Sequence, residues 1–188
     1  MVTTADGAAL ARIDDHGKIQ QQVANAERGM IFVPAPGGEQ VAYVPIGARV
    51  FGNLHLVGSD GSGKREIETG PALAALWSPD GQSIAYITFA SDEEFKTTST
   101  RSQEAPTLEW HILDVATGHS RALTRFVPSE EFFNLLPFFD QYAQSIRLWD
   151  TMSRRLVYAD NAGVWTLDVQ TGEVTNVAPG VIGLWLER

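Results

Sequence analysis

The feature that most constrains the fold of this chain is an internal repeat in its second half. Residues 76–87 align without gaps on residues 148–159, and each segment has an apolar pair ending in Trp, a polar turn, and an apolar alternation that includes a Tyr. Downstream, residues 110–118 match residues 164–172 in the same order. Two independent matches in one order indicate a duplicated structural unit, the sequence signature of a repeat architecture.

Weaker copies extend the repeat toward both ends. Residues 30–44 contain two apolar runs around a Pro-Gly-Gly turn, and residues 53–62 add a further apolar run and turn. Residues 10–18 match the second hairpin of a unit, and residues 181–185 match the first strand of another. We therefore predict one domain, 1–188, with three units at about 27–70, 71–126 and 127–178 and a fourth split between 1–26 and 179–188.

The turns and the runs between them favour antiparallel strands. Pro79 and Gly81 stand at the second and fourth positions of a polar tetrapeptide, as a type I turn prefers. The loops at 114–118 and 168–172 end in Gly, which tolerates positive φ. The flanking runs alternate with period two and are rich in Val, Ile, Trp and Tyr. Each unit is predicted to be a four-stranded antiparallel meander, the blade of a propeller.

These residues carry a family resemblance. Residues 77–86 resemble the aromatic-Ser-Pro-Asp-Gly repeat of TolB-like β-propellers, and residues 58–65 are similar to the second hairpin of that repeat. The resemblance implies an all-β propeller of four-stranded antiparallel blades, and it is compatible with an extracytoplasmic location. Two arrangements stay open. Either the segment 181–186 pairs with the N-terminal hairpin and closes four blades, or the chain is an open arc or fragment of a larger propeller that self-associates or needs a partner.

Composition and charge disfavour several classes of partner. The net charge of −9 argues against nucleic acid, which is bound through Lys and Arg, and against an anionic membrane surface. The apolar runs are much shorter than the roughly 18 residues of a membrane helix, so we expect no membrane span. The N-terminus has no signal-peptide pattern, and the absence of cysteine excludes disulfides and thiolate metal sites. The compartment stays open.

Known catalytic and metal motifs are not supported by their context. The run from Gly58 to Lys64 imitates a phosphate-binding loop, but Arg65 replaces the Ser/Thr and no helix is predicted to follow. His55 and His111 occupy a repeat position that Trp165 fills in the next copy, which indicates cross-strand stacking, not metal ligation. No Gly-x-Ser-x-Gly nucleophile motif occurs. We therefore assign no catalytic, cofactor or metal-binding residue.

Two insertions interrupt the repeat, and departures of this kind are where function resides in repeat folds. One is polar (90–107) and the other aromatic-rich (125–144), and the meander topology places both on one face. In the second, Ser129 is predicted to cap a short helix that Pro137 stops. Its aromatics either pack as a plug over the propeller or bind a partner, and the candidate partner-binding residues are Phe132, Phe133, Phe138, Phe139, Asp140 and Tyr142.

The leading functional hypothesis is a non-enzymatic protein-interaction scaffold that binds its partner through the insertion-bearing face. The first alternative is an accessory propeller of a larger hydrolase or peptidase whose catalytic residues lie outside this chain. The second is a propeller that binds a small ligand or a glycan.

Overall fold

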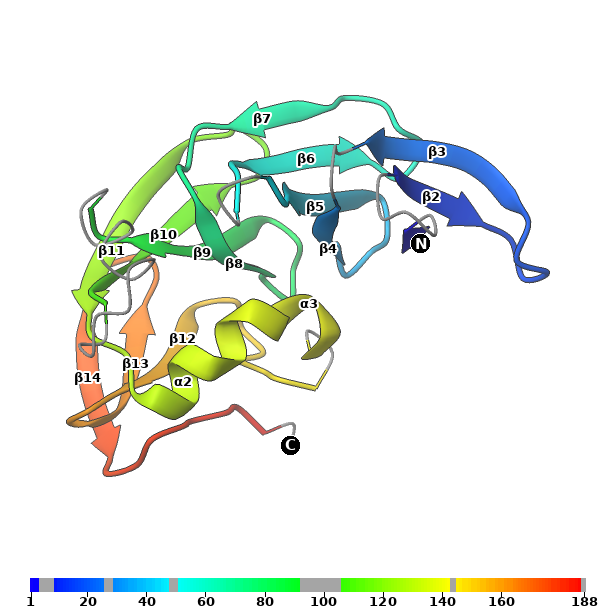
Figure 1. Ribbon diagram of the computed structural model, residues 1–188. Helices are drawn as coiled ribbons and strands as arrows, with labels where there is room; N and C mark the ends of the chain where they lie inside the picture. Colours follow the sequence, from blue (N-terminus) through cyan, green and yellow to red (C-terminus); the bar gives the residue numbers. More distant parts are fainter. Residues whose placement is uncertain (4–8, 26–28, 48–50, 92–105, 143–144, 187–188) are drawn as a thin grey trace. The chain divides into compact units, whose positions relative to one another are not determined.

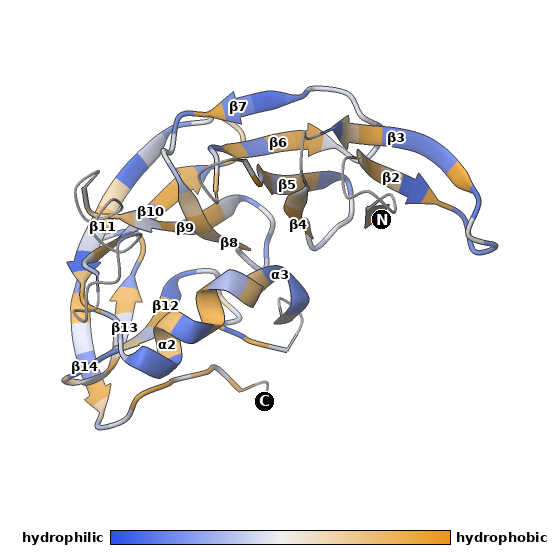
Figure 2. Ribbon diagram, viewed as in Figure 1, coloured by the Kyte–Doolittle hydropathy of each residue, from blue (hydrophilic) through white to orange (hydrophobic). Residues whose placement is uncertain are grey.

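The structure is a computed structural model that describes residues 1–3, 9–25, 29–47, 51–91, 106–142 and 145–186 (Figure 1). The fold is all-β, with four antiparallel sheets and a short helical insertion. The internal contacts divide the chain into two compact units, Met1–Ala72 and Leu73–Arg188, which are described separately below. Figure 2 shows hydrophobic residues concentrated along strands of each unit.

The first unit contains a three-stranded and a four-stranded sheet. The three-stranded sheet has the order β1-β2-β3 and the bounds Val2–Thr3, Ala9–Ile13 and Ile19–Asn25. The four-stranded sheet has the order β4-β5-β6-β7 and the bounds Met30–Pro34, Gln40–Pro45, Leu54–Gly58 and Arg65–Ile67. The two sheets share one apolar core, because Leu10 and Val23 of the first pack with Val41 and Val57 of the second.

The second unit repeats the meander and adds the helices. Its four-stranded sheet has the order β11-β10-β9-β8, with bounds β8 Ala72–Trp77, β9 Ser83–Phe89, β10 Leu108–Asp114 and β11 Ser120–Phe126. Its three-stranded sheet contains β12 Arg155–Asp160, β13 Gly163–Asp168 and β14 Val174–Ala178. Trp149 forms a β-bridge to Leu156, so the chain before Arg155 takes the place of a first strand in this sheet.

The tight turns have the geometry that their residues predict. The Gly81 N–H donates to Ser78 O at 2.9 Å, and Gly81 has a φ of 69°. In the last sheet Ser153 takes the equivalent position with a φ of 56°, although it is not glycine. Its hydroxyl accepts a hydrogen bond from the Asp80 N–H at 3.0 Å, which links the first turns of the two sheets of the second unit. This bond compensates for part of the cost of a left-handed serine.

The run from Gly58 to Lys64 is a hairpin turn, as predicted from the repeat. The Gly61 N–H donates to Gly58 O and the Gly58 N–H to Ser62 O, both at 2.8 Å. The Asp60 carboxylate accepts bonds from the backbone N–H and the hydroxyl of Ser62. The Nζ of Lys64 lies 5.8 Å from the ring centroid of Tyr43. The N–H groups of Gly58, Gly61 and Ser62 thus donate within the turn, and that of Ser59 donates to Glu39 O. This is a hairpin turn and not a loop whose N–H groups point together at a phosphate.

Histidines at the repeated position stack on tyrosine, as predicted. His55 lies opposite Tyr43 with ring centroids 4.9 Å apart, and His111 lies opposite Tyr86 at 4.7 Å, with interplanar angles of 14° and 7°. In the last sheet Trp165 lies opposite Tyr158 in the same register. Within the described residues no group of three or more His, Asp or Glu side chains is placed to hold a metal ion.

The segment 181–186, predicted as a strand, is not assigned to any strand in the structure. Its Trp185 N–H donates to Arg147 O at 2.8 Å, and the Ser129 hydroxyl donates to Val181 O at 2.6 Å. Gly183 lies so close to β12 and β13 that an added Cβ would come within 2.7 Å of Val157 Cγ2 and 2.5 Å of Val164 Cγ1. The segment is therefore packed against the last sheet of its own unit.

Candidate functional site

The candidate site is the helical insertion, residues 130–142, which connects β11 to the last sheet. It comprises α2 (Glu130–Leu135), the 3₁₀ helix η1 (Leu136–Phe138) and α3 (Phe139–Tyr142). Figure 1 shows it lying over the second unit beside β12. No helix among the residues that the structure describes is long and apolar enough to cross a membrane.

Ser129 starts the insertion as an N-cap, as the sequence predicted. Its extended backbone (φ −62°, ψ 156°) lets the hydroxyl oxygen accept the Phe132 N–H at 3.2 Å. Glu130 and Glu131 follow in the first turn, where negative charge is favoured by the helix dipole. Because the same hydroxyl donates to Val181 O, one buried serine holds both the helix and the C-terminal segment in place.

Helix α2 ends at Leu135, two residues before Pro137, as predicted, but the helical path continues beyond it. Proline lacks an N–H and fits the first turn of a helix, where that group has no intrahelical partner. The chain therefore begins a new short helix, η1, with Pro137 in its first turn. Sequence reasoning missed the helices η1 and α3, which leave Phe138 exposed to solvent and bury Phe139.

The insertion is fixed to the sheets by buried aromatic residues. Phe132 is fully buried, with its ring centroid 6.5 Å from that of Trp110 and 5.9 Å from that of Phe126. Tyr158 of β12 completes the cluster, 4.8 Å from Phe126 between centroids. Burial raises the pKa of Tyr158 to about 12, so its phenol stays neutral at physiological pH. The rings of Phe126 and Phe132 therefore belong to the core of the second unit.

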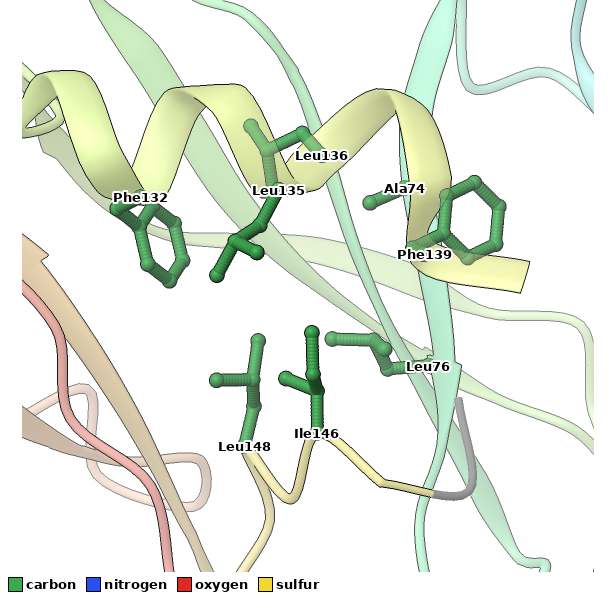
Figure 3. Close-up of a pocket in the computed structure, with 8 residues that line it drawn as sticks. All are labelled: Ala74, Leu76, Phe132, Leu135, Leu136, Phe139, Ile146 and Leu148. Carbon is green, nitrogen blue, oxygen red and sulfur yellow. The ribbon is translucent and has the colours of Figure 1, made fainter. Parts of the chain in front are cut away.

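A small apolar cavity remains beneath the insertion (Figure 3). Its volume is ≈ 20 Å³, about the room needed by one water molecule. Figure 3 shows Phe132 and Leu135 pointing from the helix toward Leu148 and Ile146. Pockets for small ligands have volumes of roughly 300–1,000 Å³ and carry polar groups that orient the ligand. This cavity therefore does not suit the small-ligand alternative and is a packing defect of the core.

The six predicted partner-binding residues have different environments. Phe132 and Phe139 are buried and belong to the core, while Phe133 is half-buried. Phe138 is 47% exposed. Asp140 is half-buried, which raises the pKa of its carboxyl above the ordinary value, although the Gln141 N–H donates to it at 2.9 Å. The backbone of Tyr142 ends α3.

The strand register shows from which end of the β8–β11 sheet each insertion leaves. Leu108 pairs with Phe89 on one side and with Phe126 on the other. The polar insertion follows Phe89 and the helical insertion follows Phe126, so both leave the same end of the β8–β11 sheet. The first turn of that sheet, Ser78 to Ser83, lies at the opposite end, where Asp114 pairs with Ser83. Residues 92–105 of the polar insertion lie outside the described residues.

The comparisons with known proteins agree with this fold. Over 113 residues the chain is 32% identical to the Tol-Pal system protein TolB of Chromobacterium violaceum, covering 56% of this chain and 23% of that protein. No family model matches the chain. The chain covers less than a quarter of the length of that TolB protein.

Solved propellers superpose on the chain at low sequence identity. A putative TolB from Agrobacterium tumefaciens matches with a TM-score of 0.55 and 15% identity, over 94% of this chain and 57% of that one. An oligogalacturonate lyase in complex with manganese matches with a TM-score of 0.57 and 15% identity, over 87% and 39%. The β-propeller domain of the Trilobed protease from Pyrococcus furiosus matches at 0.50 and 19%, over 78% and 41%.

The class defined by these four antiparallel sheets and their neighbours is the β-propeller. Within that class, the chain is similar in sequence to a TolB protein over 113 residues and similar in fold to a putative TolB, which supports the predicted TolB-like resemblance.

Proposed function

We propose that this chain is a protein-interaction module that binds its partner through the insertion-bearing face, around residues 90–107 and 125–144. The observation that carries the proposal is Phe138, an exposed aromatic on an insertion whose neighbours Phe132 and Phe139 are buried. Aromatic residues held on a rigid base lose little conformational entropy on binding and dominate many protein interfaces. The named TolB relative belongs to the Tol-Pal system, which is compatible with a role in protein assembly.

The charges around Phe138 suggest the chemistry of the partner. Glu130 and Glu131 are exposed on the same insertion, and the whole chain has a net charge of −9. The partner is thus expected to offer an apolar pocket for the Phe138 ring, with basic residues around its rim. Exposed Pro137 precedes Phe138 and restricts the backbone there, which keeps the ring presented.

The test compares two exposed apolar residues at opposite ends of the sheets. Proteins captured by the immobilised chain are identified by mass spectrometry, and the affinity of the purified candidate is then measured by calorimetry. Phe138→Ala is expected to weaken binding by about 30-fold, the loss typical of a central aromatic. Met152→Ala, at a position 79% exposed in the turn that Ser153 links to Asp80, is the matched control and should bind like the wild type. Equal binding by all three proteins would refute the role of this face.

The alternative of an accessory propeller in a larger peptidase is supported by the likeness to the propeller domain of the Trilobed protease. In that case the surface around Phe138 would contact a catalytic domain. The same capture experiment distinguishes the two ideas, because the captured protein would then be a hydrolase.

A further inference from the structure

Two side chains of the helical insertion lie on either side of the buried residue Phe139. Phe139 lines the small cavity beneath the insertion together with Ala74 of β8 (Figure 3). Successive residues of a helix are rotated by about 100° around its axis. Because Phe139 faces β8, Phe138 and Asp140 emerge on the two flanks of the helical path, where Phe138 is exposed and Asp140 is half-buried.

The Asp140 carboxyl has no cation beside it among the residues that the structure describes. Its one recorded hydrogen bond comes from the Gln141 N–H, at 2.9 Å, and no Lys, Arg or His of the described ranges forms an ion pair with it. Burial raises the pKa of this carboxyl, because the charged form loses part of its hydration. A cation supplied by a partner would compensate for the hydration that is lost.

Other carboxylates near the insertion are less suited to select a cation. Glu130 and Glu131 are exposed, and ion pairs between exposed side chains contribute little because water and salt screen them. Asp160 of β12 already accepts two backbone N–H groups and the indole N–H of Trp165. Pairing with a cation should therefore contribute more to selectivity at Asp140 than at these three residues.

We propose that the partner places an extended basic segment across the insertion, in which an Arg or Lys pairs with Asp140 and an apolar residue two positions away packs on the Phe138 ring. This inference rests on the proposed function and specifies the chemistry of its partner. Side chains two residues apart in an extended segment lie on one face about 7 Å from each other, and a helix with its side chains is about 10 Å wide. One segment can therefore reach both flanks.

A library of random 12-residue peptides displayed on phage is the probe, selected on the immobilised chain and on three variants. The wild type is expected to enrich peptides with a basic and an apolar residue two positions apart. Asp140→Asn should lose the basic preference and keep the apolar one, while Phe138→Ala should lose the apolar preference. Glu173→Gln is the matched control. It changes the net charge by the same amount at an exposed residue of the β13–β14 hairpin, and should select like the wild type.

A second measurement changes the peptide and leaves the protein intact. A selected peptide that contains arginine is compared by calorimetry with its analogue containing citrulline, which keeps the shape of the side chain and lacks the charge. The citrulline peptide is expected to bind the wild type about 10-fold more weakly, because a charge-assisted hydrogen bond becomes a neutral one. The two peptides should bind Asp140→Asn with affinities within about 2-fold of each other, since the variant has no carboxylate to pair with the guanidinium.

The outcomes separate this inference from the proposed function. An undiminished basic preference in Asp140→Asn, with the apolar preference lost in Phe138→Ala, would overturn the role of Asp140 and leave the interaction surface standing. The same loss of basic peptides in Glu173→Gln would assign the preference to net charge and also overturn it, as would a wild type that enriches no such peptides. Selection by Phe138→Ala that matches the wild type would refute the surface itself, and this inference with it.

Discussion

The tyrosine–histidine pairs show how a repeated position is used at the scale of single residues. His111 stacks on Tyr86, and its Nε2 lies 3.0 Å from Thr88 Oγ1 and 3.6 Å from Glu109 Oε2. Burial lowers the pKa of His111, while the nearby Glu109 carboxylate opposes that shift. Burial is the larger effect, so the ring is neutral in the folded protein and serves as a flat packing surface. Burial also lowers the pKa of His55 in the first unit.

Acidification is therefore expected to destabilise the chain through these histidines. A folded pKa below the unfolded value of 6.5 means that the unfolded state binds more protons. The stabilisation is present above pH 6.5 and is lost as the pH falls from there through the folded pKa. Urea unfolding from pH 8 to pH 5 should show this loss, and His111→Trp, which copies Trp165, should reduce it. An unchanged pH dependence in the variant would contradict the assignment to His111.

A buried and an exposed phenylalanine of the insertion are expected to contribute very differently to stability. Phe132→Ala removes a fully buried ring from the cluster with Trp110 and Phe126, and should lower the free energy of unfolding by about 3–5 kcal/mol. Phe138→Ala changes an exposed side chain and should stay within about 0.5 kcal/mol of the wild type. Equilibrium urea denaturation measures both. A large destabilisation by Phe138→Ala would mean that this residue is structural and not available to a partner.

At the scale of elements, the helical insertion depends on its cap more than on its length. Helix α2 has six residues, too few to be stable by itself in water. Its order comes from Ser129 at one end and from the buried Phe132 at the centre. Since Ser129 also bonds Val181 O, the insertion and the C-terminal segment are expected to loosen together.

Ser129→Ala tests this coupling. The substitution removes the acceptor of the Phe132 N–H and the donor to Val181 O, and should cost about 0.5–2 kcal/mol of stability. Hydrogen exchange should become faster in α2 and at Trp185, whose N–H bonds Arg147 O. Ser129→Thr keeps both hydrogen-bonding functions and is the control. Faster exchange in α2 alone would show that the two segments are independent.

At the scale of the whole molecule, the net charge of −9 bears on how a partner approaches. An acidic protein attracts a basic partner over a distance set by the ionic strength, about 8 Å at 0.15 M salt. If the partner of the Phe138 surface is basic, as proposed, association is accelerated by this attraction and dissociation is governed by the buried aromatic contact.

The association rate should therefore fall as salt is raised from 50 to 500 mM, while the dissociation rate changes little. Surface plasmon resonance with the partner identified by capture would measure both rates. For the Phe138→Ala variant the opposite pattern is expected, with faster dissociation and an almost unchanged association rate. An association rate that does not depend on salt would argue against a basic partner.

Much of the fold followed from the sequence because its determinants are local. The turn at Gly81, the stacking position of His55 and His111, and the cap at Ser129 each depend on residues within one turn or on neighbouring strands. Alternation of apolar residues with period two and the repeated turns then define antiparallel meanders. The placement of the two insertions at one end of a sheet follows from the same meander.

Only the tertiary structure decided which aromatics of the insertion are buried and which are exposed. Phe138 and Phe139 are adjacent in the sequence, but η1 begins at Leu136 and turns one outward and the other inward. Tertiary packing also places the segment 181–186 against the last sheet, where Gly183 permits close contact with Val157 and Val164. Such outcomes depend on the packing of segments far apart in the chain, for which a single sequence has no local signal. The sequence by itself determined the repeated blades, and long-range packing decided which surfaces they leave exposed.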